Sequence, residues 1–414
     1  MKDSQIYDCI VVGGGAAGMM AAGTSAMEGK KVLLLEKNKS LGEKLKITGG
    51  GRCNITNEEQ DIRKFLKFYD TGEDFLYSPF SQFGNKETFK FFEDKGLPLV
   101  VQARKRAFPH TEKAFDVFNT LKKYIENGKV QVRLNNAVKK ISKENNKIIS
   151  VETKDGVFQA KSFIFATGGV SHPETGSTGD GFGWLRDLGH TVKDPTPSIV
   201  PLKLSDKWVH TLAGVSLSFM KITFYLEGKK QFSKKGKILF THFGLSGPLI
   251  LNCAKKVADL LHEGEVTAKI DAYPDTDLGS LEKKVIKVFD ANKNRTLRNA
   301  FREIAPTGTA KGLELIFSGI DFTTKVHSIT KEERKEIVQT LKALPVHIES
   351  LMGFDRAVVA DGGVILEEID TKTMRSKLYS NLYIVGDLLH ITRPSGGFSL
   401  QLCWTTGYVA GKNA

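Results

Sequence analysis

The sequence predicts an α/β fold in which a nucleotide-binding Rossmann domain is interrupted by a second, β-rich domain. Three observations lead to this prediction. The first 36 residues read as strand, glycine turn, helix and strand. Further buried-strand patterns end near residue 165 and near residue 385, close to the end of the chain. Between them, residues 195–274 are rich in β-branched residues, glycine and proline, which is typical of a barrel or a sandwich.

The N-terminal elements predict a strand–helix–strand unit. Apolar runs at Ile10–Val12 and Val32–Leu35 have the length of buried parallel strands. The small residues of Ala16–Met27 predict a helix between them. Since parallel strands need such a crossover, the three elements together predict a βαβ unit.

The following elements extend the same domain. Apolar spacing predicts a helix over residues 115–127, and turn signals separate short strands over residues 130–160. Residues 163–165 predict a buried strand that ends in "ATGG". Residues 382–385 predict a last strand, and a helix over residues 399–411 follows it.

The middle of the chain predicts an inserted domain. The chain leaves the first domain near residue 194 and returns near residue 345. We therefore expect one discontinuous domain of residues 1–194 and 346–414. Residues 195–345 form the barrel-like insertion, and the helical spacing of their apolar residues predicts a helical subdomain at about residues 278–320.

Positive charge is concentrated in the inserted domain. The chain has a net charge of +13, and residues 195–345 hold 24 basic against 16 acidic groups. Such an excess attracts polyanions, RNA among them, or only aids solubility. The basic runs Arg104–Arg106 and Lys229–Lys237 either contact phosphates or form solvated loops.

Other features exclude several classes of protein. No stretch reaches the roughly eighteen apolar residues that span a bilayer, and the N-terminus lacks an apolar signal core. We therefore expect no membrane contact and a cytoplasmic location. The four cysteines are scattered without CxxC pairs, which argues against a zinc site and a disulfide scaffold. We predict no metal site and leave the oligomeric state open.

A glycine pattern near the N-terminus predicts a dinucleotide site. Gly13-x-Gly15-x-x-Gly18 follows a buried strand and opens a helix, and Glu36 ends the next strand. These glycines allow a tight turn and let backbone N–H groups approach a pyrophosphate, to which the helix N-terminus adds partial positive charge. Glu36 is placed to accept hydrogen bonds from ribose hydroxyls.

Two further glycine-rich strand ends favour FAD over NAD as the bound dinucleotide. Ala166-Thr167-Gly168-Gly169 and Gly386-Asp387 return to the sheet that carries the N-terminal fingerprint. A large dinucleotide touched by both ends of the chain fits FAD in a glutathione-reductase-like domain. No second GxGxxG is present. NADH or NADPH would therefore bind transiently as electron donor, or another donor would reduce the flavin.

Five segments resemble one family of flavoproteins. They are "GEKLKITGGGRCNITN", "RAFPHTEKAFDVFNTL", "FIFATGGVSHPETGSTGDGF", "FTHFGLSGPLIL" and "GGFSLQLCWTTGYVAGK". In this order they resemble the BaiN/RdsA-like flavoproteins, also described as YhiN-like or aminoacetone-oxidase-like, over nearly the whole chain. The resemblance implies an FAD domain interrupted by a β-barrel-like domain with a helical subdomain, and redox chemistry at a flavin. Members of that family have been linked to reduction of unsaturated bile-acid intermediates, dihydrouridine formation in ribosomal RNA and oxidation of aminoacetone.

The resemblance also implies a set of cofactor contacts. Residues Gly397–Leu400 are expected to bring backbone N–H groups to the flavin edge where negative charge develops on reduction. The predicted cofactor-binding residues are Gly13, Gly15, Ala16, Ala17, Gly18, Glu36, Lys37, Lys44, Gly49, Gly51, Arg52, Cys53, Asn54, Val138, Ala166, Thr167, Gly168, Gly386, Asp387, Gly397, Phe398, Ser399 and Leu400.

The C-terminal segment departs from the family pattern beside the expected flavin. Many relatives have Glu, Asp and Tyr-Asn where this chain has Asp387, His390 and Phe398-Ser399. Arg393 lies in the same segment. Because these differences lie beside the expected flavin, the substrates of relatives are not carried over to this chain.

Four residues are candidates for catalysis: Cys53, Arg52, His390 and Ser399. Cys53 is either a redox or acid residue beside the flavin or a small side chain packed in a tight loop, and we favour the packed side chain. Arg52 contacts FAD or an anionic substrate, or it pairs with a structural carboxylate. His390 is an acid–base catalyst or a surface or capping residue.

The sequence leaves several functions open. The favoured hypothesis is an NADH- or NADPH-dependent reductase of an electron-poor C=C bond, acting on a small molecule or on an RNA base. For the RNA version, uridine in ribosomal RNA would become dihydrouridine, and the basic inserted domain would contact the RNA. The alternatives are a reductase of unsaturated steroid-like ketones, an amine or ketone oxidase that produces peroxide, and a non-catalytic RNA-binding flavoprotein.

Overall fold

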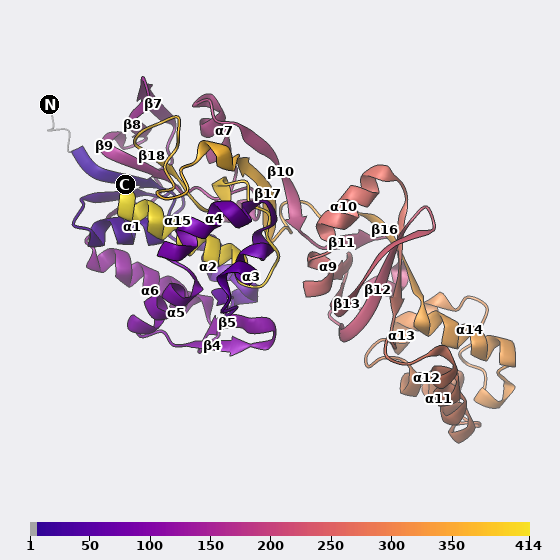
Figure 1. The fold of residues 1–414 in the computed structure, drawn as a ribbon. Helices are drawn as coiled ribbons and strands as arrows, with labels where there is room; N and C mark the ends of the chain where they lie inside the picture. Colours follow the sequence, from indigo (N-terminus) through magenta and orange to yellow (C-terminus); the bar gives the residue numbers. More distant parts are fainter. Residues whose placement is uncertain (1–5) are drawn as a thin grey trace. The chain divides into compact units, whose positions relative to one another are not determined.

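The computed structural model describes residues 6–414. Residues 1–5, with which the predicted first domain begins, lie outside the described residues. The chain divides into two compact units (Figure 1). The first unit ends at Thr196 and resumes at Val358, and the second unit comprises Pro197–Ala357.

The two unit boundaries lie beyond the predicted residues 194 and 345. The difference at the second boundary has a structural cause. Strand β16 (Leu344–Leu351) pairs with two strands of the barrel, so the inserted unit continues past residue 345.

The first unit is built on a mainly parallel sheet. Its order is β6-β2-β1-β9-β8-β7, and β18 pairs with β9. The strands that end at the same edge, β1, β2, β6, β9 and β18, are parallel, whereas β7 and β8 form an antiparallel hairpin. The strands are β1 (Ile6–Val12), β2 (Val32–Leu35), β6 (Gln131–Arg133), β7 (Lys140–Glu144), β8 (Lys147–Thr153), β9 (Gly156–Phe165) and β18 (Leu382–Ile384).

Helices bury the parallel strands, which explains why these strands are apolar on both sides. Helix α1 packs against the C-terminal helix α15, and the two lie side by side in Figure 1. The contact is close because Cβ atoms at Gly407 and Gly411 would lie only 2.5 and 2.4 Å from backbone oxygens of α1. The helices of this unit are α1 (Ala16–Met27), α2 (Glu43–Ile47), α3 (Ile62–Leu66), α4 (Glu73–Gln82), α5 (Asn85–Asp94), α6 (Ala114–Asn127), α7 (Asp180–Asp187) and α15 (Phe398–Asn413).

Two small sheets complete the first unit, and one of them contains the strands at which the chain leaves and re-enters this unit. The order of the three-stranded sheet is β3-β5-β4, and β10 pairs with β17. These strands are β3 (Thr56–Asn57), β4 (Leu99–Gln102), β5 (Arg106–Pro109), β10 (Val192–Ile199) and β17 (Val359–Val364).

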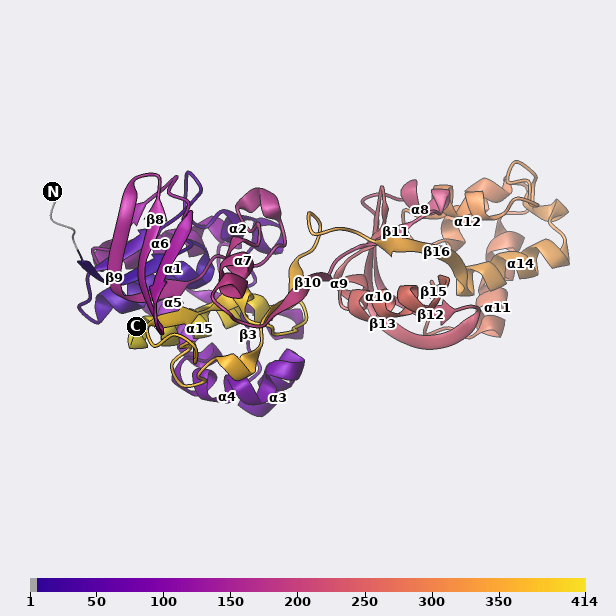
Figure 2. The same cartoon turned by 90° about the horizontal axis from the view of Figure 1, so that it is seen from above.

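The second unit is a closed six-stranded barrel with helices at its end. The strand order is β11-β14-β13-β12-β15-β16, and its pairs are antiparallel. Helices α11, α12 and α14 gather beyond one end of the barrel strands (Figures 1 and 2). The remaining elements are β11 (Leu202–Leu204), β12 (Ser216–Leu226), β13 (Lys229–Thr241), β14 (Gly244–Ser246), β15 (Val266–Asp271), α8 (Lys207–His210), α9 (Pro248–Leu251), α10 (Ala254–Glu263), α11 (Leu278–Ala291), α12 (Leu297–Ile304), α13 (Ala310–Leu313) and α14 (Lys331–Lys342).

The predicted fold class, a Rossmann-type α/β domain interrupted by a barrel-like domain, is confirmed. The helical part of the insertion continues beyond the predicted residue 320, because α14 packs on α11 and covers one side of the barrel core. Among residues 6–414 no helix has the length and apolar character that crossing a membrane requires.

Candidate active site

A deep cleft lies at the carboxyl ends of the parallel strands in the first unit. Its empty space is about 1240 Å³ when the open solvent at its entrance is included, and Val12, Leu35, Ala166 and Val385 line it where four of the strands end. Ligands of open α/β sheets bind at this edge because the strand ends and helix N-termini meet there. The cleft is therefore the natural place for the predicted dinucleotide.

The glycine turn after β1 forms one wall of the cleft. Gly13 has φ +104°, and a Cβ there would lie 2.5 Å from the Ala166 oxygen, so only glycine fits. A Cβ at Gly18 would lie 1.8 Å from the Gly13 oxygen, so this glycine allows the helix to pack on the turn. Gly15 differs, since a Cβ there would meet no atom within 4 Å. Its backbone borders the empty space of the cleft at the N-terminus of α1.

A fixed carboxylate stands at the end of β2. Glu36 is buried, and its two carboxylate oxygens accept hydrogen bonds from the backbone N–H groups of Gly14 at 2.7 Å and Asn38 at 2.8 Å. The oxygens keep further lone pairs for ribose hydroxyls. Next to it, the Lys37 Nζ contacts Asp180 at 2.8 Å, and both residues line the cleft.

The opposite end of the cleft carries a buried charged group. The Arg393 side chain is only 1% exposed, and its guanidinium donates to the Asp387 carboxylate and, at 3.1 Å, to Ser399 Oγ. Asp387 and Ser399 line the cleft, and Arg393 lies behind them. Lys44 also lines the cleft, and its Nζ donates to Ser171 Oγ at 3.1 Å. Burial lowers the pKa of Lys44, and the nearby Asp387 carboxylate opposes this shift.

Helix α15 adds positive potential at this end. It is sixteen residues long and begins at Phe398, directly after Gly397, whose φ of +99° turns the chain into the helix. Ser399 and Leu400 in its first turn line the cleft. Two cations, one carboxylate and a helix N-terminus therefore give this wall a net positive character.

The residues present fit a flavin dinucleotide. The open space at Gly15 admits a group that approaches the backbone, as a pyrophosphate does. Thr167 lines the cleft, and its buried Oγ1 has no hydrogen-bond partner in the described part of the chain. No cluster of His, Cys, Asp and Glu within residues 6–414 could hold a metal ion.

Comparison with known proteins places this cleft in a family. The sequence profile of the HI0933-like protein Rossmann domain matches residues 7–413. The chain belongs to this family. Members similar to it include a 3-dehydro-bile acid delta(4,6)-reductase of Clostridium scindens, which is 29% identical over 409 residues and 98% of each chain. A ribosomal RNA dihydrouridine synthase of Haemophilus influenzae is 28% identical over 411 residues, again 98% of each chain.

A solved structure shares the fold. The 3-ketosteroid delta1-dehydrogenase from Sterolibacterium denitrificans matches 98% of both chains with a TM-score of 0.54 at 13% identity, which shows the fold alone. The predicted membership of the BaiN/RdsA group is confirmed, and this HI0933-like chain is an FAD-dependent oxidoreductase.

The structure brings most of the predicted cofactor residues of this HI0933-like protein to one cleft. They come from seven separate stretches of the chain. The predicted residues that line it are Gly13, Gly15, Ala16, Ala17, Glu36, Lys37, Lys44, Val138, Ala166, Thr167, Gly168, Gly386, Asp387, Ser399 and Leu400. The predicted residues outside its lining are Gly18, Gly49, Gly51, Arg52, Cys53, Asn54, Gly397 and Phe398.

The glycine-rich loop after α2 adjoins the cleft, whose lining includes Thr48 at the start of the loop. Arg52 Nε pairs with the Glu112 carboxylate at 2.6 Å, its Nη2 donates to Gln102 at 2.8 Å, and its guanidinium stacks on the Phe108 ring. The Asn54 amide, in the orientation that satisfies its neighbours, accepts from the Gly397 N–H at 2.9 Å. Asn54 thereby fixes the start of α15, and Arg52 is held by protein groups.

Cys53 is buried in the same loop. Its side chain has no exposed surface, and burial raises its pKa to about 12. A thiol in this setting is neither a thiolate nor in contact with the cleft. These observations support the packed side chain over a redox residue.

His390 lies apart from the cofactor cleft. It lines a second, more open hollow in the first unit, together with Lys193, Glu367 and Lys377. Its buried Nδ1 has no partner within the described residues, and its backbone N–H donates to the Val364 oxygen. Of the four catalytic candidates, only Ser399 lines the cleft.

Several lining residues were not predicted. Asn38, Thr48, Ser177, Asp180 and Trp184 all line the cleft. Ser177 and Asp180 belong to the turn-rich segment "TGSTGD", which follows the "ATGG" strand end. This segment is the sequence signal that could have indicated further cleft-lining residues. Cys403 also lines the cleft, one helical turn after Ser399, and burial raises its pKa to about 12.

Proposed function

We propose that this protein reduces an electron-poor C=C bond with NADH or NADPH as electron donor. The observation that carries the proposal is the positive wall formed by Lys44, Arg393 and the N-terminus of α15. Bound FAD would supply hydride transfer. Fixed positive groups stabilise the negative charge that develops on a reduced flavin. A stabilised reduced flavin suits a reductase, in which the reduced cofactor must persist until the substrate binds.

The residues at this wall have separate roles in the proposal. Asp387 and Ser399 touch the cofactor space, and Arg393 positions both of them from behind. Because the Arg393 Nε–H occupies a lone pair of Ser399 Oγ, the Ser399 hydroxyl proton is free to point into the cleft. We assign Ser399 as the group that donates this hydrogen bond to the ligand or substrate. The predicted lining residues of the glycine turn and Glu36 would hold the adenosine and pyrophosphate.

We further propose uridine in ribosomal RNA as the substrate and dihydrouridine as the product. Two observations support an RNA substrate: the basic character of the inserted unit and the full-length similarity to a ribosomal RNA dihydrouridine synthase. The reaction would take place in the cytoplasm, where ribosomal RNA and pyridine nucleotides are present.

A second candidate substrate is an unsaturated steroid-like ketone. The full-length similarity to a bile-acid reductase favours it. Both substrates contain a C=C bond conjugated to a carbonyl group, so the same cleft chemistry would serve either one.

The test is anaerobic reduction of the purified protein with NADH and with NADPH, followed by addition of candidate acceptors. The proposal expects one nucleotide to bleach the flavin and uridine-containing ribosomal RNA to restore its absorbance, with dihydrouridine detected by mass spectrometry. If only an unsaturated steroid ketone restores the flavin absorbance, the substrate is that ketone and not ribosomal RNA. In a separate assay in air, peroxide formation with an amine would indicate an oxidase. A flavin that neither nucleotide reduces would refute the proposed donor.

A further inference from the structure

A row of lysines lies on the outer face of β12 and β13 in the barrel unit. The register pairs Lys221 directly with Lys235. Like charges directly opposite each other destabilise a sheet. Lys237 follows on the same face, and neither Lys221 nor Lys237 pairs with a carboxylate in the described chain. The sheet therefore holds uncompensated positive charge.

The acidic groups near this row have other partners. Asp275 pairs with Lys235 at 2.7 Å, which neutralises one lysine of the row. Asp271 lies opposite Lys221 on β15, but its carboxylate contacts Lys342 at 2.7 Å. Lys221 and Lys237 consequently keep their charge available for an anion from outside the chain.

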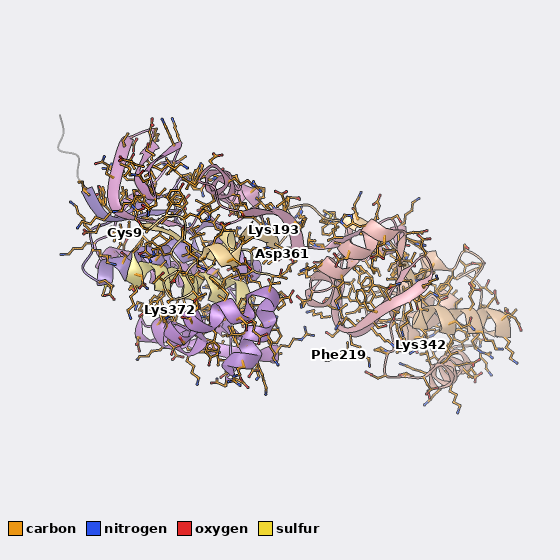
Figure 3. The ribbon with its side chains drawn as sticks, turned by 45° about the horizontal axis from the view of Figure 1, so that its top comes forward. Cys9, Lys193, Phe219, Lys342, Asp361 and Lys372 are labelled. Atoms are coloured by element: carbon orange, nitrogen blue, oxygen red, sulfur yellow. The ribbon has the colours of Figure 1, made fainter. Side chains whose placement is uncertain are left out.

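An exposed aromatic side chain stands at the same face. The register between β12 and β13 shifts between Leu217 and Met220, so that Ser218 and Phe219 together face Lys237. Phe219 has φ +61° and is 78% exposed, the highest value for a large apolar side chain among residues 6–414. Figure 3 shows it on the outside of the barrel unit. A bulky residue in this backbone region is strained, and strain of this kind is concentrated at functional sites.

A second aromatic residue lies farther along β12. Tyr225 pairs with Lys230, and the Nζ of Lys269 lies 5.4 Å from the centre of its ring. Between the two aromatic residues, Thr223 and Ser233 form a cross-strand hydroxyl pair at 2.8 Å. The six-residue span along β12 measures about 20 Å at a rise of about 3.3 Å per residue. Lysines and hydroxyls fill this span between two rings.

We propose that this face, formed by Phe219, Lys221, Tyr225, Lys235 and Lys237, binds single-stranded RNA. Lysines contact phosphates while aromatic rings stack on bases, and the combination distinguishes a single-strand surface from a purely electrostatic one. Sheet surfaces with two or three such aromatic residues stack on two or three bases in other RNA-binding domains. The inference rests on the proposed RNA substrate, since the bound strand would carry the uridine.

The charge component is tested with the FAD-loaded full-length protein and a short fluorescein-labelled oligouridine, by anisotropy at several salt concentrations. The variant is Lys221→Ala/Lys235→Ala/Lys237→Ala. Its matched control is Lys283→Ala/Lys287→Ala/Lys311→Ala, which removes three exposed charges from the helices of the same unit. We expect the first variant to bind at least about tenfold more weakly, with a salt slope about 1.4 smaller because Asp275 already pairs with Lys235, and the control to bind like wild type.

The stacking component is tested with Phe219→Ala, which changes no charge. We expect binding about five- to 150-fold weaker with an unchanged salt slope, because each stacked base contributes about 1–3 kcal/mol. The matched control is Phe115→Ala, an exposed aromatic residue of the first unit. Flavin absorbance and thermal unfolding of every variant check that the chain is folded.

Three results would overturn the proposal: wild-type affinity of Phe219→Ala, equal weakening by the control variants, or equally strong binding of polyglutamate or of phosphatidylserine vesicles. Failure of this surface is distinguishable from failure of the proposed function. If the protein binds oligouridine through this face but never reduces it, the proposed RNA-binding surface stands and the proposed RNA substrate is refuted. A protein that forms dihydrouridine while the face variants bind normally refutes the surface.

Discussion

Replacing Gly15 with alanine separates the cofactor site from the stability of the fold. Gly15 has φ −79° and ψ −168°, which alanine adopts without strain, and a Cβ there would meet no protein atom within 4 Å. We therefore expect the free energy of unfolding of the FAD-free protein to change by no more than about 0.5 kcal/mol.

The same Cβ would occupy the space that a pyrophosphate needs. Loss of a charge-assisted backbone hydrogen bond costs about 1.5–3 kcal/mol, which corresponds to an FAD dissociation constant about ten- to 150-fold higher. Titration of the FAD-free protein, followed by quenching of flavin fluorescence, measures this constant, and urea denaturation of the same samples measures stability.

Gly18→Ala is the matched comparison for this experiment. Its Cβ would lie 1.8 Å from the Gly13 oxygen, so the turn and α1 must separate, and we expect a loss of about 3 kcal/mol in stability even without FAD. Wild-type FAD affinity of Gly15→Ala would refute the placement of the pyrophosphate against this turn. A large loss of stability in Gly15→Ala would refute the inference that Gly15 faces open space.

Three further predictions follow from the site and its surroundings. Arg393→Met leaves Asp387 without its main partner and should lower the stability of the FAD-free protein by about 2–3 kcal/mol in urea denaturation. Adding Asp387→Asn should recover part of this loss. No loss of stability in Arg393→Met would contradict the buried ion pair. Cys53→Ser should keep FAD bound and change turnover less than about twofold, since the thiol lies outside the cleft lining; loss of turnover with FAD retained would restore a redox role. Burial lowers the pKa of His190 below its usual 6.5, although Glu368 opposes the shift. As the pH falls, the unfolded chain therefore takes up the proton before the folded chain does. The free energy of unfolding should consequently fall as the pH drops below about 6.5. His190→Gln should flatten that dependence, and an unchanged slope would assign it to other groups.

The sequence predicted the elements whose signals are local. The helix Ala16–Met27 and the strand Val32–Leu35 have the predicted bounds, because a glycine turn and short apolar runs determine them within a few residues. The glycine fingerprint and Glu36 were predicted for the same reason. The inserted barrel was indicated by composition alone, and its last strand was missed because β16 is recognisable only through its pairing with β11 and β15.

Side-chain direction accounts for the parts of the site that the sequence could not determine. Arg52, Cys53 and Asn54 are next to one another in the sequence, yet Arg52 reaches Glu112, Cys53 is buried and Asn54 holds Gly397. The positive φ of Cys53, +58°, turns the loop between them. Likewise, Arg393 and Ser399 lie in the segment that departs from the family pattern, and only the folded chain shows that they touch.

The most direct test of the proposed reaction is the dihydrouridine content of ribosomal RNA, measured by mass spectrometry in cells that lack this protein. Cells are complemented with the wild-type gene or with Gly15→Ala. If uridine is reduced at the FAD cleft, dihydrouridine should disappear from ribosomal RNA on deletion and return with the wild-type protein. With the variant, the amount of dihydrouridine should stay below the wild-type amount. Unchanged dihydrouridine in the deletion strain would contradict the proposed reaction.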